Sequence, residues 1–91
     1  MFLVSQVFSR RESQEVVDYA MGMLETASGR RQLGRFLIKG FCDLYQGEYN
    51  PHYLTGLGSA LWAVDQFWRN RQVVSTVLYQ YLDFLFQNLR S

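Results

Sequence analysis

Apolar residues recur at helical spacing along nearly the whole chain. They fall three or four positions apart in four stretches, which cover about residues 9–26, 30–46, 51–70 and 72–90, and this period is typical of amphipathic α-helices. The connections are short, which favours neighbours that pack antiparallel or at a steep angle. The pattern therefore predicts an all-α fold: a compact bundle of four main helices in a single domain over residues 1–91.

Local signals indicate where these helices begin and end. Ser9–Glu12 has the form of a capping box, so we expect the first helix to begin there and to fray at Thr26–Gly29. Gly47 is a candidate stop for the second helix. Asn50–Pro51 reads as an N-cap followed by proline at the first helical position. The stretch Thr55–Ala60 has little intrinsic helicity, so the third helix either continues through it or breaks there.

The first eight residues do not share the period of the helix that follows. If that helix were extended backwards, Val4 and Val7 would lie on its polar face. Residues 1–8 are therefore interpreted as an N-terminal arm, a short extended segment or a separate turn. An apolar arm of this kind can pack across a partner chain.

The second helix has a wide apolar arc and two internal glycines. The residues expected to be buried on this arc are Leu33, Phe36, Leu37, Ile38, Phe41, Leu44 and Tyr45. Gly34 and Gly40 each weaken a helix by up to about 1 kcal/mol relative to alanine. Close approach of another helix would account for them.

The last helix is apolar around more of its circumference than a surface helix needs. Over residues 72–90 its apolar side chains cover roughly 220° of the helical wheel at 100° per residue, whereas a surface helix shows a stripe of about 100° or somewhat more. Such a helix must be covered from two sides. With 48% hydrophobic and 16% aromatic residues in a chain of 91, this predicts a homodimer that pairs through the last helix.

The net charge and the few reactive side chains exclude several kinds of site and identify none. The net charge is +1, and there is one cysteine and one histidine, so an internal disulfide and the usual zinc-ligand spacings are ruled out. Cys42 is expected to be an incidental surface thiol and His52 a structural or exposed side chain. Phosphate-binding loops and nucleophile elbows are missing from the sequence, so we expect no enzyme activity, cofactor or metal.

The start lacks a basic signal-peptide region and no apolar run could span a bilayer, which favours a cytoplasmic location.

A basic stripe runs along the second helix opposite its apolar arc. Arg31, Arg35 and Lys39 follow one another at four-residue intervals, with Arg30 beside them. Like charges at this spacing repel each other and destabilise the helix slightly, which is some evidence that the stripe has a binding role. One interpretation is contact with phosphates of nucleic acid or anionic lipid. The other is a solvated face on which Asp43 supports Lys39.

Aromatic residues of the third and fourth helices are the candidate contacts for a partner. Trp62 lies among polar and small residues, which suits an interface anchor, unless the helix breaks near Gly58 and the indole enters the core. Tyr79, Phe84 and Phe86 complete the predicted apolar interface.

Charge also divides between helices, because the first is acidic outside and the second is basic outside. Residues 12–25 carry four carboxylates: Glu12, Glu15, Asp18 and Glu25. Opposite faces of this kind favour pairing of chains and selectivity between partners. We therefore expect a small protein-protein interaction module, acting as an adaptor, chaperone or regulatory modulator. A nucleic-acid-binding regulator is the alternative, and weak attachment to a membrane surface is a third possibility.

Overall fold

Most of the described part of the chain is helical. A computed structural model places Phe8 and residues 11–47 and 50–89. In chain order the elements are α2 (Ser13–Gly22), a single 3-10 turn η1 (Met23–Glu25), α3 (Ala27–Leu44), α4 (Pro51–Phe67) and α5 (Arg71–Leu89). The predicted all-α bundle of four main helices is confirmed, and the described residues form no strand.

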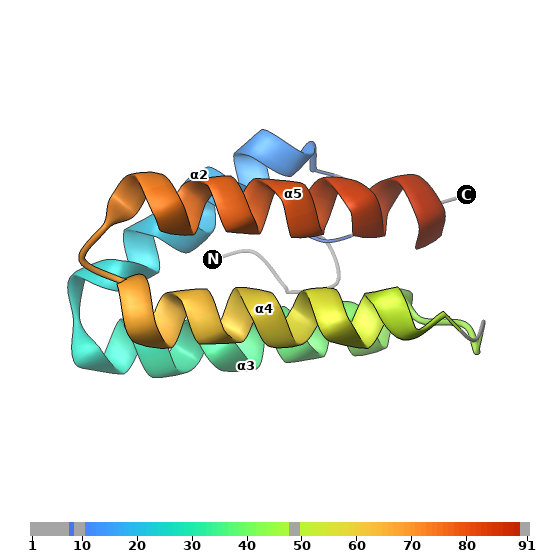
Figure 1. The fold of residues 1–91 in the computed structure, drawn as a ribbon, viewed down its shortest axis with the longest axis horizontal. Helices are drawn as coiled ribbons and strands as arrows, with labels where there is room; N and C mark the ends of the chain where they lie inside the picture. The colour runs from blue at the N-terminus through green and yellow to red at the C-terminus, as the bar shows by residue number, and fades with distance from the viewer. Residues whose placement is uncertain (1–7, 9–10, 48–49, 90–91) are drawn as a thin grey trace.

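The helices pack so that α4 lies between α3 and α5. Figure 1 shows α3 and α4 side by side and antiparallel, with α5 along the other flank of α4 and α2 behind α5. The closest packing joins α4 to α5 and α2 to α5. The accessible surface is 5837 Å², close to the value of about 5,500 Å² that scaling gives for a compact monomer of this mass.

Side-chain caps start α4 and α5. Asn50 accepts a hydrogen bond at 2.9 Å from the backbone N–H of His52, and Pro51 is the first helical residue. This confirms the predicted start of α4. In the same way Asn70 accepts a hydrogen bond from the N–H of Val73 at 3.2 Å at the start of α5. Both caps satisfy N–H groups that have no partner within their helix.

The start of α2 differs from the prediction. Residues 9 and 10 lie outside the described part of the chain, and Arg11 and Glu12 precede the helix, which begins at Ser13. The carboxylate of Glu15 accepts a hydrogen bond from the backbone N–H of Glu12 at 3.3 Å. The capping interaction therefore centres on Glu12 rather than on Ser9, and the helix begins at Ser13.

The predicted fraying region around Thr26 begins a new helix instead. After α2 the chain tightens into η1, and then the Thr26 hydroxyl accepts a hydrogen bond from the N–H of Gly29 at 2.9 Å. The threonine thus caps α3, which begins at Ala27 rather than Arg30. At its other end α3 stops at Leu44. Gly47 follows with a φ of +90°, in the left-handed region that glycine adopts readily.

Helix α4 is continuous through the stretch of low helicity. Gly56 lies directly against the ring of Tyr81, because a Cβ at this glycine would be 3.0 Å from the ring. The glycine therefore allows α5 to approach α4 closely. Packing against α5 offsets the weak intrinsic propensity of this stretch.

The broad apolar surface of α5 is covered within the same chain. Its buried residues are Val74, Leu78, Tyr81, Leu82, Leu85, Phe86 and Leu89. As predicted, the helix is covered from two sides, but α4 and α2 supply the cover. A hydrogen bond at 3.2 Å from the Ser13 hydroxyl to the Asp83 carboxylate adds a polar link between α2 and α5. Most of the apolar arc that suggested a dimer through this helix is therefore covered within the chain, and the homodimer stays a prediction.

Phe8 is a core residue of its own chain. Its ring is fully buried and meets the rings of Phe36 and Phe86 edge-on, with centroids 5.0 and 5.7 Å apart. It also lies directly against Gly40, where a Cβ would overlap the ring. This contact explains the glycine, which the sequence analysis had assigned to a helix-helix approach. The remainder of the predicted arm, residues 1–7, lies outside the described part of the chain.

Candidate protein-interaction surface

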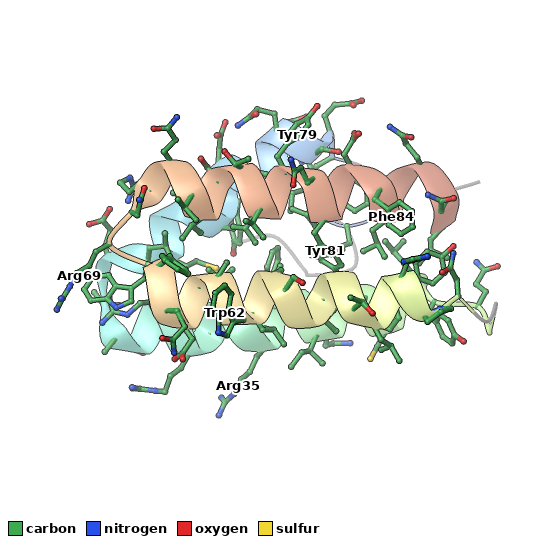
Figure 2. All side chains as sticks on the ribbon, in the orientation of Figure 1. Arg35, Trp62, Arg69, Tyr79, Tyr81 and Phe84 are labelled. Atoms are coloured by element: carbon green, nitrogen blue, oxygen red, sulfur yellow. The ribbon has the colours of Figure 1, made fainter. Side chains whose placement is uncertain are left out.

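Trp62 lies on the outer surface of α4. Because the helix does not break, the indole stays on the polar side and is 60% exposed. Figure 2 shows it on the outward face of α4. Its only ring neighbour in the described part of the chain is Phe67, at 5.1 Å and edge-to-face. The alternative in which Trp62 enters the core is therefore wrong.

The other three predicted interface residues do not join Trp62 in one surface. Tyr79 is exposed on α5, where it lines a hollow with Gln14 of α2, and Figure 2 shows it far from Trp62. Phe84 is half-buried between helices, 5.6 Å from the ring of Tyr53. Phe86 is only 6% exposed. The structure therefore corrects the placement of Phe86, which belongs to the core and is not on the surface.

Exposed apolar side chains gather instead where α3 and α4 run together. Ile38 and Tyr45, which were expected to be buried, are exposed on α3, and Leu54 of α4 is 65% exposed. Leu54 was not singled out from the sequence, although it precedes Leu61 by two helical turns on the same side of the helix. We call this surface the α3–α4 face. It comprises Ile38 and Tyr45 of α3 and Leu54, Gly58, Leu61 and Trp62 of α4.

Two hollows fix the register of the α3–α4 face. At one end a hollow of about 390 Å³ is lined by Arg31, Gly34 and Leu61, among others. At the other end a hollow of about 350 Å³ is lined by Tyr45 and Leu54, among others. Because the helices are antiparallel, these two pairings place Ile38 opposite Gly58, midway between the hollows. The face is therefore one continuous strip along the junction of α3 and α4.

The predicted basic patch separates into paired and unpaired cations. The Arg30 guanidinium lies 3.8 Å from the centre of the Trp68 ring and donates a hydrogen bond at 2.8 Å to the carbonyl of Leu24. Lys39 forms an ion pair with Asp43 at 3.1 Å, as one interpretation of the stripe expected. Arg30 and Lys39 therefore have partners within the chain.

Arg31 and Arg35 are the two members of the patch left without such a partner. Both are exposed, and neither forms an ion pair or a hydrogen bond with another described side chain. Figure 2 shows Arg35 extending from α3 into solvent. Arg31 lines the same hollow as Leu61. The charge of Arg31 thus borders the α3–α4 face, and Arg35 follows it one helical turn later on α3.

The acidic residues of the first helical region serve mainly within the chain. Glu15 pairs with Arg11 at 3.3 Å, and Glu25 pairs with Arg71 at 3.0 Å. The second pair joins η1 to the start of α5. Asp18 accepts a hydrogen bond from the Gln14 side chain. Exposed ion pairs of this kind contribute little to stability, but they reduce the free negative charge on this side.

The cysteine and the histidine of the chain both lie at the surface. Cys42 is exposed, and no group of histidine, cysteine and carboxylate side chains in these residues could hold a metal ion. His52 is exposed beside a hollow between α4 and α5. In the described part of the chain, no helix is both long and apolar enough to cross a membrane.

Comparison with protein-family models, with curated proteins and with solved structures gave no match to this chain.

Proposed function

We propose that this protein is an interaction module that docks a partner protein on the α3–α4 face. The observation that carries the proposal is the exposure of two large apolar side chains of α4, since Leu54 is 65% and Trp62 is 60% exposed. Tryptophan and other large anchors dominate the binding energy of protein interfaces. Covering these side chains would remove apolar surface from water, which favours association.

Helix α3 contributes to this surface two apolar residues that are not part of the core. Ile38 and Tyr45 are exposed beside α4, while the core of α3 is formed by other residues such as Leu33 and Leu37. The fold therefore does not need Ile38 to be apolar. An adaptor, a chaperone or a regulatory modulator could use such a face.

The nucleic-acid alternative loses part of its support. Only Arg31 and Arg35 remain as unpaired cations of the basic stripe, and two phosphate contacts would give weak binding to nucleic acid. The homodimer stays a prediction, but its reason has changed. If two copies associate, we expect them to meet through the α3–α4 face, because the apolar arc of α5 is covered.

Photocross-linking in cells of the source organism tests the proposal. With Trp62→p-benzoylphenylalanine we expect an adduct of defined mass, whose second component mass spectrometry identifies as a protein. The matched control carries the same photoreactive residue at Tyr79, an exposed tyrosine of α5, and should give no such adduct. An adduct from position 79 alone, or from neither position, would overturn the proposal. An adduct of twice the chain mass would identify the partner as a second copy.

A further inference from the structure

We infer that the partner presents an acidic amphipathic helix, which lies lengthwise along the α3–α4 face. The inference rests on the proposed function and adds to it the shape and charge of the partner segment. Three features carry it: the length and spacing of the face, the glycine in its middle, and the unpaired arginines of α3.

The spacing of the face suits a helix. On α4 the positions Leu54, Gly58 and Leu61 follow at intervals of four and three residues, which is the spacing by which one helix packs along another. Ile38 and Tyr45 lie seven residues apart on α3, which places both on one side of that helix. Counted from Arg31 at its border to Tyr45, the face and its flanking hollows extend over about 21 Å at 1.5 Å per residue. A partner helix of about four turns would span it.

Gly58 provides room for a second backbone at the middle of the face. A Cβ at this position would meet nothing within 4 Å, so no neighbour in its own chain requires a glycine here. Glycine inside a helix costs about 1 kcal/mol relative to alanine. Gly56 differs, because the ring of Tyr81 packs against it. Gly58 therefore leaves no side chain on the outer surface of α4 between Leu54 and Leu61, and Trp62 follows it four residues later.

The positive charge beside the α3–α4 face indicates which kind of partner helix would bind there. Arg31 lines the hollow at one end of the strip, Arg35 follows it one helical turn later, and neither has a carboxylate partner in the described chain. The one carboxylate in the adjoining hollow is Asp65, which accepts a hydrogen bond at 2.7 Å from the Gln66 side chain. Arg30 adds a further positive charge to this hollow, above Trp68. A helix with apolar residues on one side and glutamate or aspartate at its edge would complement both the strip and the arginines.

A second copy of this chain is a poor source of such a helix. Its acidic helix, α2, already buries its own apolar side, which includes Val16 and Val17, in the core. Residues 1–7 contain no carboxylate. The occupant is therefore expected to be a different protein.

Designed peptides of equal length separate the parts of this inference. One peptide carries leucines at helical spacing flanked by glutamates, a second has the glutamates replaced by glutamines, and a third has them replaced by lysines. Binding to the full chain is measured by titration calorimetry, and the site is mapped by amide shifts in NMR spectra. We expect the acidic peptide to bind about tenfold more tightly than the neutral one, with shifts confined to α3 and α4.

Variants of the chain supply matched controls. The double substitution Arg31→Glu with Arg35→Glu should reverse the preference in favour of the lysine peptide. Lys39→Glu, on the same helix but away from the α3–α4 face, should leave the preference unchanged. Gly58→Leu adds a side chain at the middle of the face and should weaken binding of all three peptides. Thermal unfolding of each variant verifies that the fold is retained.

The outcomes distinguish this inference from the proposed function. If the neutral peptide binds the α3–α4 face as tightly as the acidic one, the inferred charge is wrong and the docking face stands. If no peptide binds while position 62 still gives a protein adduct, the helical acidic partner is overturned and the proposed function stands. Self-association through α3 and α4 would overturn the inference in favour of a second copy. Salt-sensitive binding of an RNA or DNA oligonucleotide, lost on substitution of both arginines and without peptide binding, would overturn it in favour of nucleic acid.

Discussion

Tyr81 is a buried side chain whose hydroxyl lacks a partner. It is 5% exposed, and its hydroxyl forms no hydrogen bond in the described part of the chain. Removing a buried polar group that has no partner is neutral or stabilising. We therefore expect Tyr81→Phe to unfold at the same or a higher urea concentration at pH 7, with a gain of up to about 1 kcal/mol.

The same residue predicts a response to alkaline pH. Burial raises the pKa of the Tyr81 hydroxyl above its usual value near 10. Above pH 10 the unfolded chain ionises this tyrosine while the folded chain keeps it neutral, so the wild type loses stability as the pH rises. Tyr81→Phe lacks this loss. The stability difference between variant and wild type should widen from pH 7 to pH 10.5, and a constant difference would contradict the burial of the hydroxyl.

Two glycines inside helices should respond oppositely to substitution by alanine. At Gly40 the new methyl group would overlap the ring of Phe8, and we expect a loss of about 1–3 kcal/mol. At Gly58 the methyl group meets nothing within 4 Å, and we expect a gain of about 1 kcal/mol from helix propensity. Urea unfolding of Gly40→Ala and Gly58→Ala measures both. Equal effects would show that the Phe8 ring does not rest on α3.

At the scale of the element, the Asn50 cap determines the start of α4. Asn50→Ala removes the acceptor for the N–H of His52, and such losses cost about 1 kcal/mol. Asn50→Asp keeps an acceptor oxygen and should retain most of that stability. Thermal unfolding of both variants tests the cap. An alanine variant as stable as the wild type would mean that Pro51 alone is sufficient to start the helix.

The sequence predicted the helices better than it predicted which side of each helix packs against another helix. The start of α4 followed from Asn50–Pro51 because a cap is a local interaction, and the helical period gave four helices. Thr26 was misread because the same residue types both end one helix and cap the next. Ile38 was misplaced because its spacing fits a wide arc. Which edge of that arc meets another helix is decided by tertiary packing, which the sequence pattern alone does not contain.

At the scale of the whole molecule, apolar residues divide between a complete core and an uncovered face. The sequence analysis treated the excess of apolar residues as one quantity and assigned it to the last helix. In the structure α2 and α4 cover that helix, and Phe8 fills the remaining space beside Phe86. Most of the exposed large apolar side chains lie on α3 and α4, where the pattern predicted one residue of the face as an interface contact, Trp62. The proposed docking surface is therefore the side of α4 that its own core does not use.

This division predicts opposite stability effects for residues that the sequence placed in one interface. Leu54→Gln with Trp62→Gln changes side chains that are exposed in the folded state, so we expect unfolding free energy to change by less than about 1 kcal/mol. Phe86→Ala leaves a cavity beside Phe8 and should cost about 3–5 kcal/mol. Calorimetric unfolding compares the two. If the double glutamine variant unfolds as readily as Phe86→Ala, Leu54 and Trp62 stabilise the fold itself, and the apolar surface of α4 is not available to a partner.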